Sequence, residues 1–449
     1  MTSLSSRYAS MTVPRYTSYP TVPHFSADVG EADYRGWLAG LDPAEPISLY
    51  LHVPFCSQLC WYCGCNMKLA SRYEPVAAYL DTLLVEVDLL AEALPARMRV
   101  SHLHWGGGTP TSLSPEDLER AMTRLRGRFD FQADAELAIE CDPRSMTSAM
   151  AERIGALGFN RASFGVQEFD PEVQRAINRI QPPEMVADCV SALRRAGVAG
   201  INFDLIYGLP HQTVARLEAT IAKSAEIGPD RIALFGYAHV PWMAKKQRLI
   251  DADALPGADE RLAQAKAAAA ALVKAGYRVI GLDHFAKPED ELAKAAAAGT
   301  LRRNFQGYTT DLAETLLGLG STSIGRTSGG FVQNIAETGA WSRAVTAGHL
   351  PIAKGIALSP ADRLRAAAIE ALMCFGTVDV KHLARAHAVA EDWAADAMPL
   401  LQEMASDGLL TLEEGRITLT EAGQPLVRIA AAVFDSYRAE TPARHSVAV

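Results

Sequence analysis

Residues 47–65 read ISLYLHVPFCSQLCWYCGC, an apolar, β-branched run that passes directly into four closely spaced cysteines. The first three, Cys56, Cys60 and Cys63, follow the spacing C-x3-C-x2-C, which places three thiolates around one tight loop. Such a set can hold three irons of a 4Fe-4S cubane and leave the fourth iron open. Because an open iron is a place for substrate chemistry, this segment predicts a reactive metal centre that directly follows a strand.

Structural zinc is the alternative for clustered cysteines. Zinc modules usually divide their ligands into two separated pairs around a knuckle, and no such pairing is apparent here. The spacing therefore favours an iron-sulfur cluster. The three isolated cysteines, Cys141, Cys189 and Cys374, are expected to be buried as small apolar side chains, since free cysteine is among the most buried residue types.

The composition is that of an ordinary globular protein. The 449 residues are 49% hydrophobic and 21% charged, with a net charge of -9, and suffice for one large domain with appendages. No apolar run approaches the ~18 residues that cross a bilayer, and the N-terminus lacks an apolar signal core. We expect a cytoplasmic protein with reduced thiols. The negative charge disfavours nucleic acid and anionic membranes as main partners.

Apolar strand-like runs alternate with amphipathic helical stretches, which is typical of an α/β fold built from βα units around a parallel sheet. Six units predict an open, partial (β/α)6 barrel, and a further strand at 277–283, after an alanine-rich helix at 259–274, would extend the sheet. The six predicted strands are 47–53, 100–105, 137–141, 162–167, 201–207 and 232–238, and the helices between them are 77–93, 115–126, 147–157, 183–196 and 215–227.

The two ends of the chain are expected to lie outside the barrel domain, which we assign to residues 36–350. Residues 1–35 lack periodicity and predict an extended arm. Residues 351–449 predict a mostly helical, winged-helix-like domain, because 408–420 alternates around Glu-Gly like a hairpin. This outline leaves a DNA-binding regulator open, but the charged residues within 400–424 are mainly acidic, which disfavours a phosphate-binding face. A lid over the barrel is favoured instead.

Ligands in such folds gather at the carboxyl ends of the strands. The cysteines follow the first predicted strand, and GGGTP at 106–110 follows the second. Glu140, Gln167, Asp204 and Ala238 lie at or near the ends of later strands. Each of these features alone is a weak signal, because glycines and carboxylates are common after strands. Their shared placement predicts one binding site.

Six short motifs are spread along the chain: YLHVPFC at 50–56, CGC at 63–65, HWGGGTPT at 104–111, GVQ at 165–167, DLIYGLP at 204–210 and NFQGYTT at 304–310. The cysteine motif resembles the radical S-adenosylmethionine superfamily. Together the motifs resemble one family within it, the oxygen-independent coproporphyrinogen III oxidases, and the likeness covers nearly the whole chain.

This resemblance implies a reaction and its partners. A reduced 4Fe-4S cluster would give one electron to S-adenosylmethionine, releasing methionine and a 5'-deoxyadenosyl radical. The radical would take a hydrogen from the β-carbon of a propionate, and loss of carbon dioxide and one more electron would leave a vinyl group. Two propionates of coproporphyrinogen III would react to give protoporphyrinogen IX in haem biosynthesis. The family also implies a monomer and a low-potential electron donor of the flavodoxin or ferredoxin type.

The resemblance also assigns the cluster and the amino-acid part of its S-adenosylmethionine. Cys56, Cys60 and Cys63 would bind iron, whereas Cys65 would not. Arg179 would bind the carboxylate as a bidentate pair. Backbone groups of two residues would receive the amino end, and there a missing side chain allows close approach; they are Gly108 and Thr109.

The remaining implied contacts concern the nucleoside and a second S-adenosylmethionine. Gln167 and Asp204 would bind the ribose hydroxyls, and the backbone of Tyr62 and Ala238 would frame the adenine. A second molecule nearby would contact Tyr50, Gly107, Glu140 and Ile324. No acid or base is assigned, because radical hydrogen abstraction requires none.

Two further expectations concern the substrate and the competing function. Arg15, Arg302 and Arg303 are candidates for holding the four substrate carboxylates, on charge matching alone. The alternative function is haem binding by a chaperone of the same superfamily. Such relatives typically lack the cysteine equivalent to Cys65 and the N-terminal arm, and both are present here.

Overall fold

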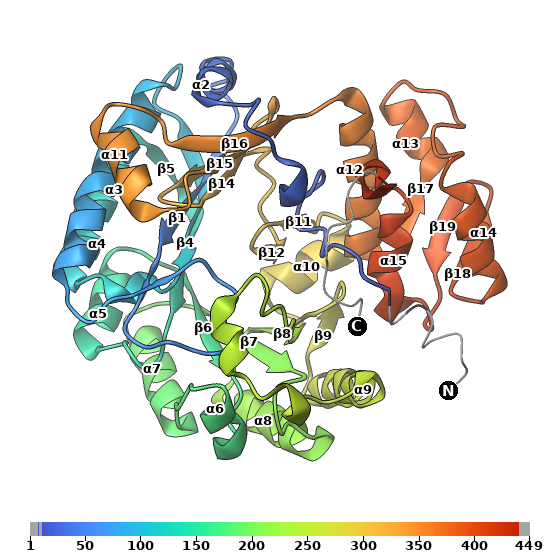
Figure 1. Cartoon of the computed structure of the whole chain (residues 1–449), viewed down its shortest axis with the longest axis horizontal. Helices are drawn as coiled ribbons and strands as arrows, with labels where there is room; N and C mark the ends of the chain where they lie inside the picture. The colour runs from blue at the N-terminus through green and yellow to red at the C-terminus, as the bar shows by residue number, and fades with distance from the viewer. Residues whose placement is uncertain (1–7, 9–10, 440–449) are drawn as a thin grey trace.

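A single twelve-stranded sheet organises the computed structural model, which describes Tyr8 and residues 11–439 (Figure 1). Its strand order is β16-β15-β14-β13-β1-β4-β5-β6-β7-β8-β10-β9, and neighbouring strands from β13 to β8 are parallel. The predicted α/β fold with an open barrel of parallel strands is confirmed. The six strands predicted for it are β1 (Ile47–Val53), β4 (Arg99–Gly107), β5 (Asp130–Cys141), β6 (Arg161–Gln167), β7 (Gly200–Tyr207) and β8 (Arg231–Gly236).

Helices alternate with these strands and cover the outside of the sheet (Figure 1). The start of α4 follows from its sequence: the Ser114 hydroxyl accepts a hydrogen bond from Asp117 N at 3.2 Å, and Pro115 occupies the first helical position. Five of the helices were predicted, namely α3 (Glu74–Glu92), α4 (Pro115–Arg128), α5 (Ser148–Ala156), α7 (Pro183–Arg195) and α8 (Val214–Ile227). The short α6 (Pro171–Ala176) was not.

The edges of the sheet differ from the prediction. Beyond β1 lie four strands that the sequence pattern did not reveal: β13 (Thr315–Leu319), β14 (Ile324–Arg326), β15 (Gly330–Asn334) and β16 (Ile352–Ala357). At the other edge, the strand expected at 277–283 is the shorter β9 (Arg278–Ile280), antiparallel to β10 (His284–Ala286), and β10 in turn is antiparallel to β8. Strands of three to six residues are too short to give a clear alternation, which explains the difference.

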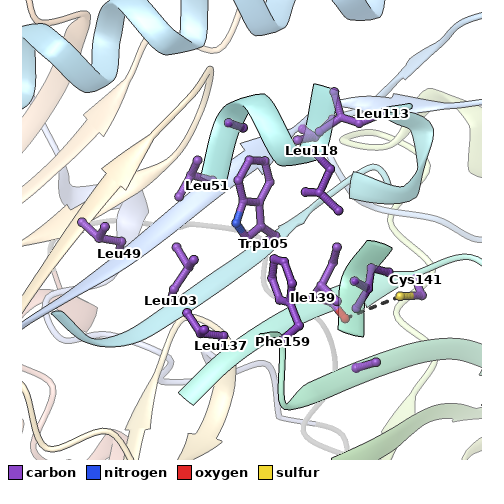
Figure 2. Packing of buried hydrophobic residues seen from close by; sticks show 14 of the residues in the cluster. Leu49, Leu51, Leu103, Trp105, Leu113, Leu118, Leu137, Ile139, Cys141 and Phe159 are labelled. Atoms are coloured by element: carbon purple, nitrogen blue, oxygen red, sulfur yellow. Dashed lines mark hydrogen bonds between the residues drawn. The ribbon is translucent and has the colours of Figure 1, made fainter. Parts of the chain in front are cut away.

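The main core lies between the sheet and its covering helices. Figure 2 shows Leu51, Leu103 and Trp105 of neighbouring strands packed together, with Trp105 fully buried. Cys141 belongs to the same cluster, and its Sγ donates to Ile139 O at 3.7 Å. All three isolated cysteines are buried, as predicted.

The C-terminal part contains the expected hairpin, β18 (Leu410–Glu413) and β19 (Arg416–Leu419), in a small sheet of order β17-β19-β18. The sheet is accompanied by helices, which gives the winged-helix-like outline (Figure 1). The other elements of this part are α12 (Pro360–Phe375), β17 (Thr377–Asp379), α13 (Val380–Ala386), α14 (Met398–Ser406) and α15 (Val427–Ala432).

The N-terminal arm packs on both parts of the molecule. Tyr16 and Tyr19 are buried in the hydrophobic cluster of the C-terminal helices, and the Tyr16 hydroxyl donates to Asp435 at 3.0 Å. Further along, Ser26 bridges to β16, and α2 (Glu31–Ala39) buries Leu38 in the barrel core. The domain limits 1–35, 36–350 and 351–449 stay predictions, and 1–7, 9–10 and 440–449 lie outside the described residues.

Candidate active site

The carboxyl ends of the parallel strands surround a cavity of about 440 Å³. The cysteine loop lines one side of it, with Cys56, Cys60 and Cys63 all present. The cavity therefore brings together most of the residues implied for cofactor binding, although they are far apart in the chain. Those that line it are Tyr62, Gly107, Gly108, Thr109, Glu140, Gln167, Arg179, Asp204 and Ala238.

The cysteine loop leaves β1 and is closed at its base by a two-stranded parallel pair, β2 (Phe55–Cys56) with β3 (Lys68–Leu69). Two contacts with the end of α6 hold its middle: Trp61 N donates to Ile177 O at 3.0 Å, and the Asn178 side chain donates to Leu59 O at 2.6 Å. The loop is thus held at its ends and at its centre.

Cations surround the cysteines. The Cys60 sulfur accepts hydrogen bonds from Arg144 Nη2 at 3.2 Å and Arg179 Nη1 at 3.3 Å. Hydrogen bonding with Cys65 and the charge of Lys246 lower the pKa of Cys63. Burial raises the pKa of Cys56 to about 12. Because the thiolate is the form that binds metal, the cations favour the ligand state of this loop.

The donor set fits a cluster. Among the residues that the structure describes, no three His, Cys, Asp or Glu side chains are grouped as a metal ion would require. A cubane with one open iron attaches each of its three thiolates to a different corner, so its cysteines need to share a cavity and not to converge on a point. Cys56, Cys60 and Cys63 meet that requirement.

The glycine loop after β4 packs directly on the backbone that carries Cys56. Gly108 N donates to Val53 O at 2.9 Å, and Thr109 N donates to Phe55 O at 2.8 Å. A Cβ on Gly108 would lie 2.6 Å from Phe55 O, so glycine is required here by the neighbouring strand. The expected reason, close approach of a ligand, is not needed to explain this glycine. Because an ammonium group donates hydrogen bonds, backbone contacts from Gly108 and Thr109 to the amino end of a ligand would use their carbonyl oxygens.

Glu140, on β5, contacts two residues of β4. Its carboxylate contacts His104 Nε2 at 3.1 Å and accepts a bond from Gly107 N at 3.3 Å. The Tyr50 ring stacks on His104 with centroids 6.0 Å apart. The structure thus brings together three residues implied for a second S-adenosylmethionine, whereas the fourth, Ile324, begins β14 and is separated from β1 by β13.

Arg179 is already engaged on several sides. Its guanidinium forms an ion pair with Asp142 at 3.4 Å, donates to Gly165 O and contacts Cys60. Although burial alone would raise it, the pKa of Asp142 is lowered to about 2 by hydrogen bonds from Arg144 and the charge of Arg179. Arg179 Nε is buried with no hydrogen-bond partner among the described residues. One N–H of Arg179 therefore remains for a ligand, and the Asp142 carboxylate balances part of the charge of the guanidinium.

Gln167 ends β6, and Asp204 lies within β7, three residues before its end; both line the same cavity. Burial, with the nearby Glu140 carboxylate, raises the pKa of Asp204 to about 7. Ser163 Oγ lies 3.4 Å from Asp204 Oδ2. The carboxyl group can therefore be either a donor or an acceptor near neutral pH.

Sequence reasoning missed Gln247, which joins the two segments expected at the adenine. Its side-chain Nε2 donates to Tyr62 O at 2.7 Å and to Ala238 O at 3.1 Å, while its Oε1 accepts from Val240 N at 2.6 Å. The side chain is only 2% exposed. A glutamine in a short 3-10 helix carries no recognisable sequence signal.

Two of the arginines proposed for the substrate have different surroundings. Arg302 is paired with Glu370 at 3.0 Å and Glu314 at 3.2 Å, so its charge is neutralised within the protein. Arg15 has its Nη2 on Gly236 O at 3.1 Å and lines the cysteine cavity. The structure therefore favours Arg15 over Arg302 as an anion-binding residue.

Comparison with known proteins supports the same class. A family model described as the Radical SAM superfamily matches residues 50–223, and one described as the HemN C-terminal domain matches residues 358–426. The barrel and its cysteine loop are thus those of a radical S-adenosylmethionine protein.

Full-length relatives narrow the class further. The chain is 47% identical over 446 residues to an oxygen-independent coproporphyrinogen III oxidase of Bradyrhizobium diazoefficiens, covering 99% of each chain. It is 41% identical to that of Escherichia coli, covering 94% of this chain and 93% of the relative. A solved structure described as "Coproporphyrinogen III oxidase (HemN) from Escherichia coli is a Radical SAM enzyme" has a TM-score of 0.91 and 39% identity, over 95% of this chain and all of that one. The chain belongs to the family of oxygen-independent coproporphyrinogen III oxidases.

Proposed function

We propose that this chain is an oxygen-independent coproporphyrinogen III oxidase of haem biosynthesis, which converts two propionate side chains of coproporphyrinogen III to vinyl groups and so forms protoporphyrinogen IX. The observation that carries the proposal is the single cavity that gathers the C-x3-C-x2-C cysteines, the glycine loop and the strand-end polar residues. Relatives of the same length bear the name of this activity.

The cofactors supply the oxidant, and the protein positions it. When bound, a 4Fe-4S cluster and S-adenosylmethionine supply the 5'-deoxyadenosyl radical that removes a propionate hydrogen. Cys56, Cys60 and Cys63 would bind the cluster. The glycine loop and Arg179 would orient the amino and carboxylate ends of the cosubstrate, and the Gln247-linked segments would hold its adenine. No residue needs to transfer a proton in the radical step.

A second S-adenosylmethionine belongs to this proposal. Gly107 and Glu140 line the cavity and Tyr50 lies beside them, which supports three of the four implied contacts. Titration of the reduced, cluster-loaded protein should bind two equivalents. Glu140→Gln should lose the second equivalent and keep the first, and a stoichiometry of one in the unmodified protein would remove this part of the proposal.

We infer a low-potential electron donor of the flavodoxin or ferredoxin type, a monomeric state and a cytoplasmic location. Within the described part of the chain, no helix has the length and apolar character of a membrane span. The electron donor follows from the radical chemistry, which begins with reduction of the cluster.

The decisive experiment is anaerobic reconstitution followed by incubation with S-adenosylmethionine, a reductant and coproporphyrinogen III. Vinyl products and 5'-deoxyadenosine should appear together. Serine variants of Cys56, Cys60 and Cys63 should lose iron and sulfide, while Cys65→Ser, the matched control, should retain them. Purified protein that contains zinc without sulfide would contradict the proposal. Tight haem binding without turnover would point to the chaperone alternative, which the oxidase relatives do not favour.

A further inference from the structure

A second and larger cavity, of about 760 Å³, lies beside the cysteine cavity. Its walls come from β8, α9 (Ala258–Lys274), β9, the N-terminal arm and the segment before α15. Much of the lining is apolar, and the volume is in the range of small-molecule sites, about 300–1,000 Å³. The apolar residues include Leu234, Phe235, Leu262, Val279, Leu282 and Phe285.

Basic side chains dominate the polar part of this lining. Five cations line the cavity, against the carboxylates of Asp283 and Glu421. This local excess of positive charge occurs in a chain whose net charge is -9. An apolar wall combined with several cations fits an amphiphilic molecule that carries several carboxylates. The cations are Arg15, Arg261, Lys266, Arg303 and Arg428.

Three of these arginines are held by backbone carbonyl groups instead of carboxylates. Arg261 Nη1 donates to Tyr237 O at 2.8 Å, and Arg303 Nε donates to Tyr16 O at 3.3 Å. Arg15, described above, is held by Gly236 O. Within the described residues, none of the three forms an ion pair. Carbonyl contacts orient the three guanidinium groups without a direct ion pair, and the nearby Asp283 carboxylate offsets part of the charge of Arg15 and Arg303.

Two buried N–H groups of this set remain unsatisfied. Arg261 Nε and Arg303 Nη1 have no hydrogen-bond partner among the described residues. Burial, and to a lesser extent the charge of Arg15, lowers the pKa of Arg428 to about 10. Leaving buried, charged donors unpaired is unfavourable, so an anionic ligand would stabilise this arrangement.

The two cavities are continuous in their lining. Arg15, Gly236, Tyr237 and Ala238 line both of them. Ala238 is one of the residues expected at the adenine of the cosubstrate, so a ligand in the larger cavity would lie next to the radical source. Arg15 occupies the junction.

We propose that the larger cavity binds the tetrapyrrole substrate, with Arg261 and Arg303 holding carboxylates away from the reacting carbon and Arg15 orienting the propionate that enters the cysteine cavity. This inference rests on the proposed function and adds the residues that recognise the substrate. It retains Arg15 and Arg303 as substrate-binding residues, replaces Arg302 with Arg261, and assigns the apolar wall to the macrocycle.

The test measures ligand binding and turnover separately. Coproporphyrin III, the oxidised tetra-acid that cannot react, is titrated into anaerobic, cluster-loaded protein while its fluorescence is followed. Arg15→Gln, Arg261→Gln and Arg303→Gln should each weaken binding by about 10- to 100-fold, as expected for losing a charged hydrogen bond. Raising the salt concentration should weaken binding to the unmodified protein.

Arg278→Gln is the matched control. Arg278 is exposed on β9, next in sequence to a residue of the cavity wall, and the change removes the same charge. Its affinity should equal that of the unmodified protein. The neutral tetramethyl ester of coproporphyrin III should bind all variants with one weak affinity. Circular dichroism and bound iron identify any variant that has lost its fold. If one of the three arginine variants has done so, the remaining two arginine variants decide the outcome.

The outcomes separate the two proposals. Unchanged coproporphyrin III affinity and unchanged KM for coproporphyrinogen III in the folded arginine variants would overturn the substrate site while leaving the proposed function intact. The same holds for an affinity lost equally in Arg278→Gln. If the unmodified, cluster-loaded protein neither binds the tetra-acid nor forms vinyl products, the proposed function itself fails.

Discussion

Gly108→Ala should disturb the cluster loop through a backbone collision. The added Cβ would lie 2.6 Å from Phe55 O, 2.8 Å from Phe55 N and 2.9 Å from Phe55 C, all of them backbone atoms that cannot rotate away. Relief requires β2, and with it Cys56, to move relative to the glycine loop. Such overpacking typically costs about 1–3 kcal/mol. If the whole cost opposes the arrangement of β2 and the glycine loop that binds S-adenosylmethionine, the affinity for this cosubstrate decreases about 5- to 140-fold.

Gly64→Ala supplies the control, because Gly64 lies between two cysteines of the same loop and a Cβ there would meet no atom within 4 Å. Both variants are reconstituted anaerobically, their iron and sulfide are quantified, and the dissociation constant for S-adenosylmethionine is measured by equilibrium dialysis. Gly64→Ala should match the unmodified protein. A Gly108→Ala variant with full cluster content and an affinity within twofold of the unmodified value would refute the reasoning.

Three further predictions concern buried polar groups. Gln247→Leu removes the amide that joins Tyr62 O to Ala238 O, so the dissociation constant for S-adenosylmethionine should rise about tenfold in a titration; an unchanged value would contradict the bridging role. Because the pKa of Asp204 is about 7, the carboxylate that accepts a ribose hydroxyl forms only as the pH rises; binding should tighten from pH 6 to 8, and Asp204→Asn should remove that dependence. Burial raises the pKa of Glu86 from 4.5 to about 7, so its protonated form stabilises the fold fully below pH 4.5 and this contribution is lost as the pH rises through 7. Glu86→Gln should flatten the pH dependence of the denaturation midpoint between pH 5 and 8, by at most about 3 kcal/mol, and an unchanged slope would contradict the shift.

The sequence alone determined the parts of this protein that are encoded within short segments. The cysteine spacing occupies ten residues, and each βα unit is recognisable by a local change from strand-like to helical periodicity. Strand ends were therefore identifiable, and the rule that ligands gather there predicted that Glu140, Gln167 and Asp204 would share a cavity. The cofactor roles of these residues came from the family resemblance, and they stay predictions.

Only the tertiary structure decided the features that depend on contacts between distant segments. Ile47 pairs with Thr315 to add β13 and the strands beyond it, and nothing local in either segment specifies that neighbour. Gln247 acquires its role because Tyr62 and Ala238 come within reach of one side chain. The arginine-lined cavity forms where β8, α9, the arm and the C-terminal part meet. A single sequence records which residues are present at such sites, whereas their proximity arises from the packing of the whole chain.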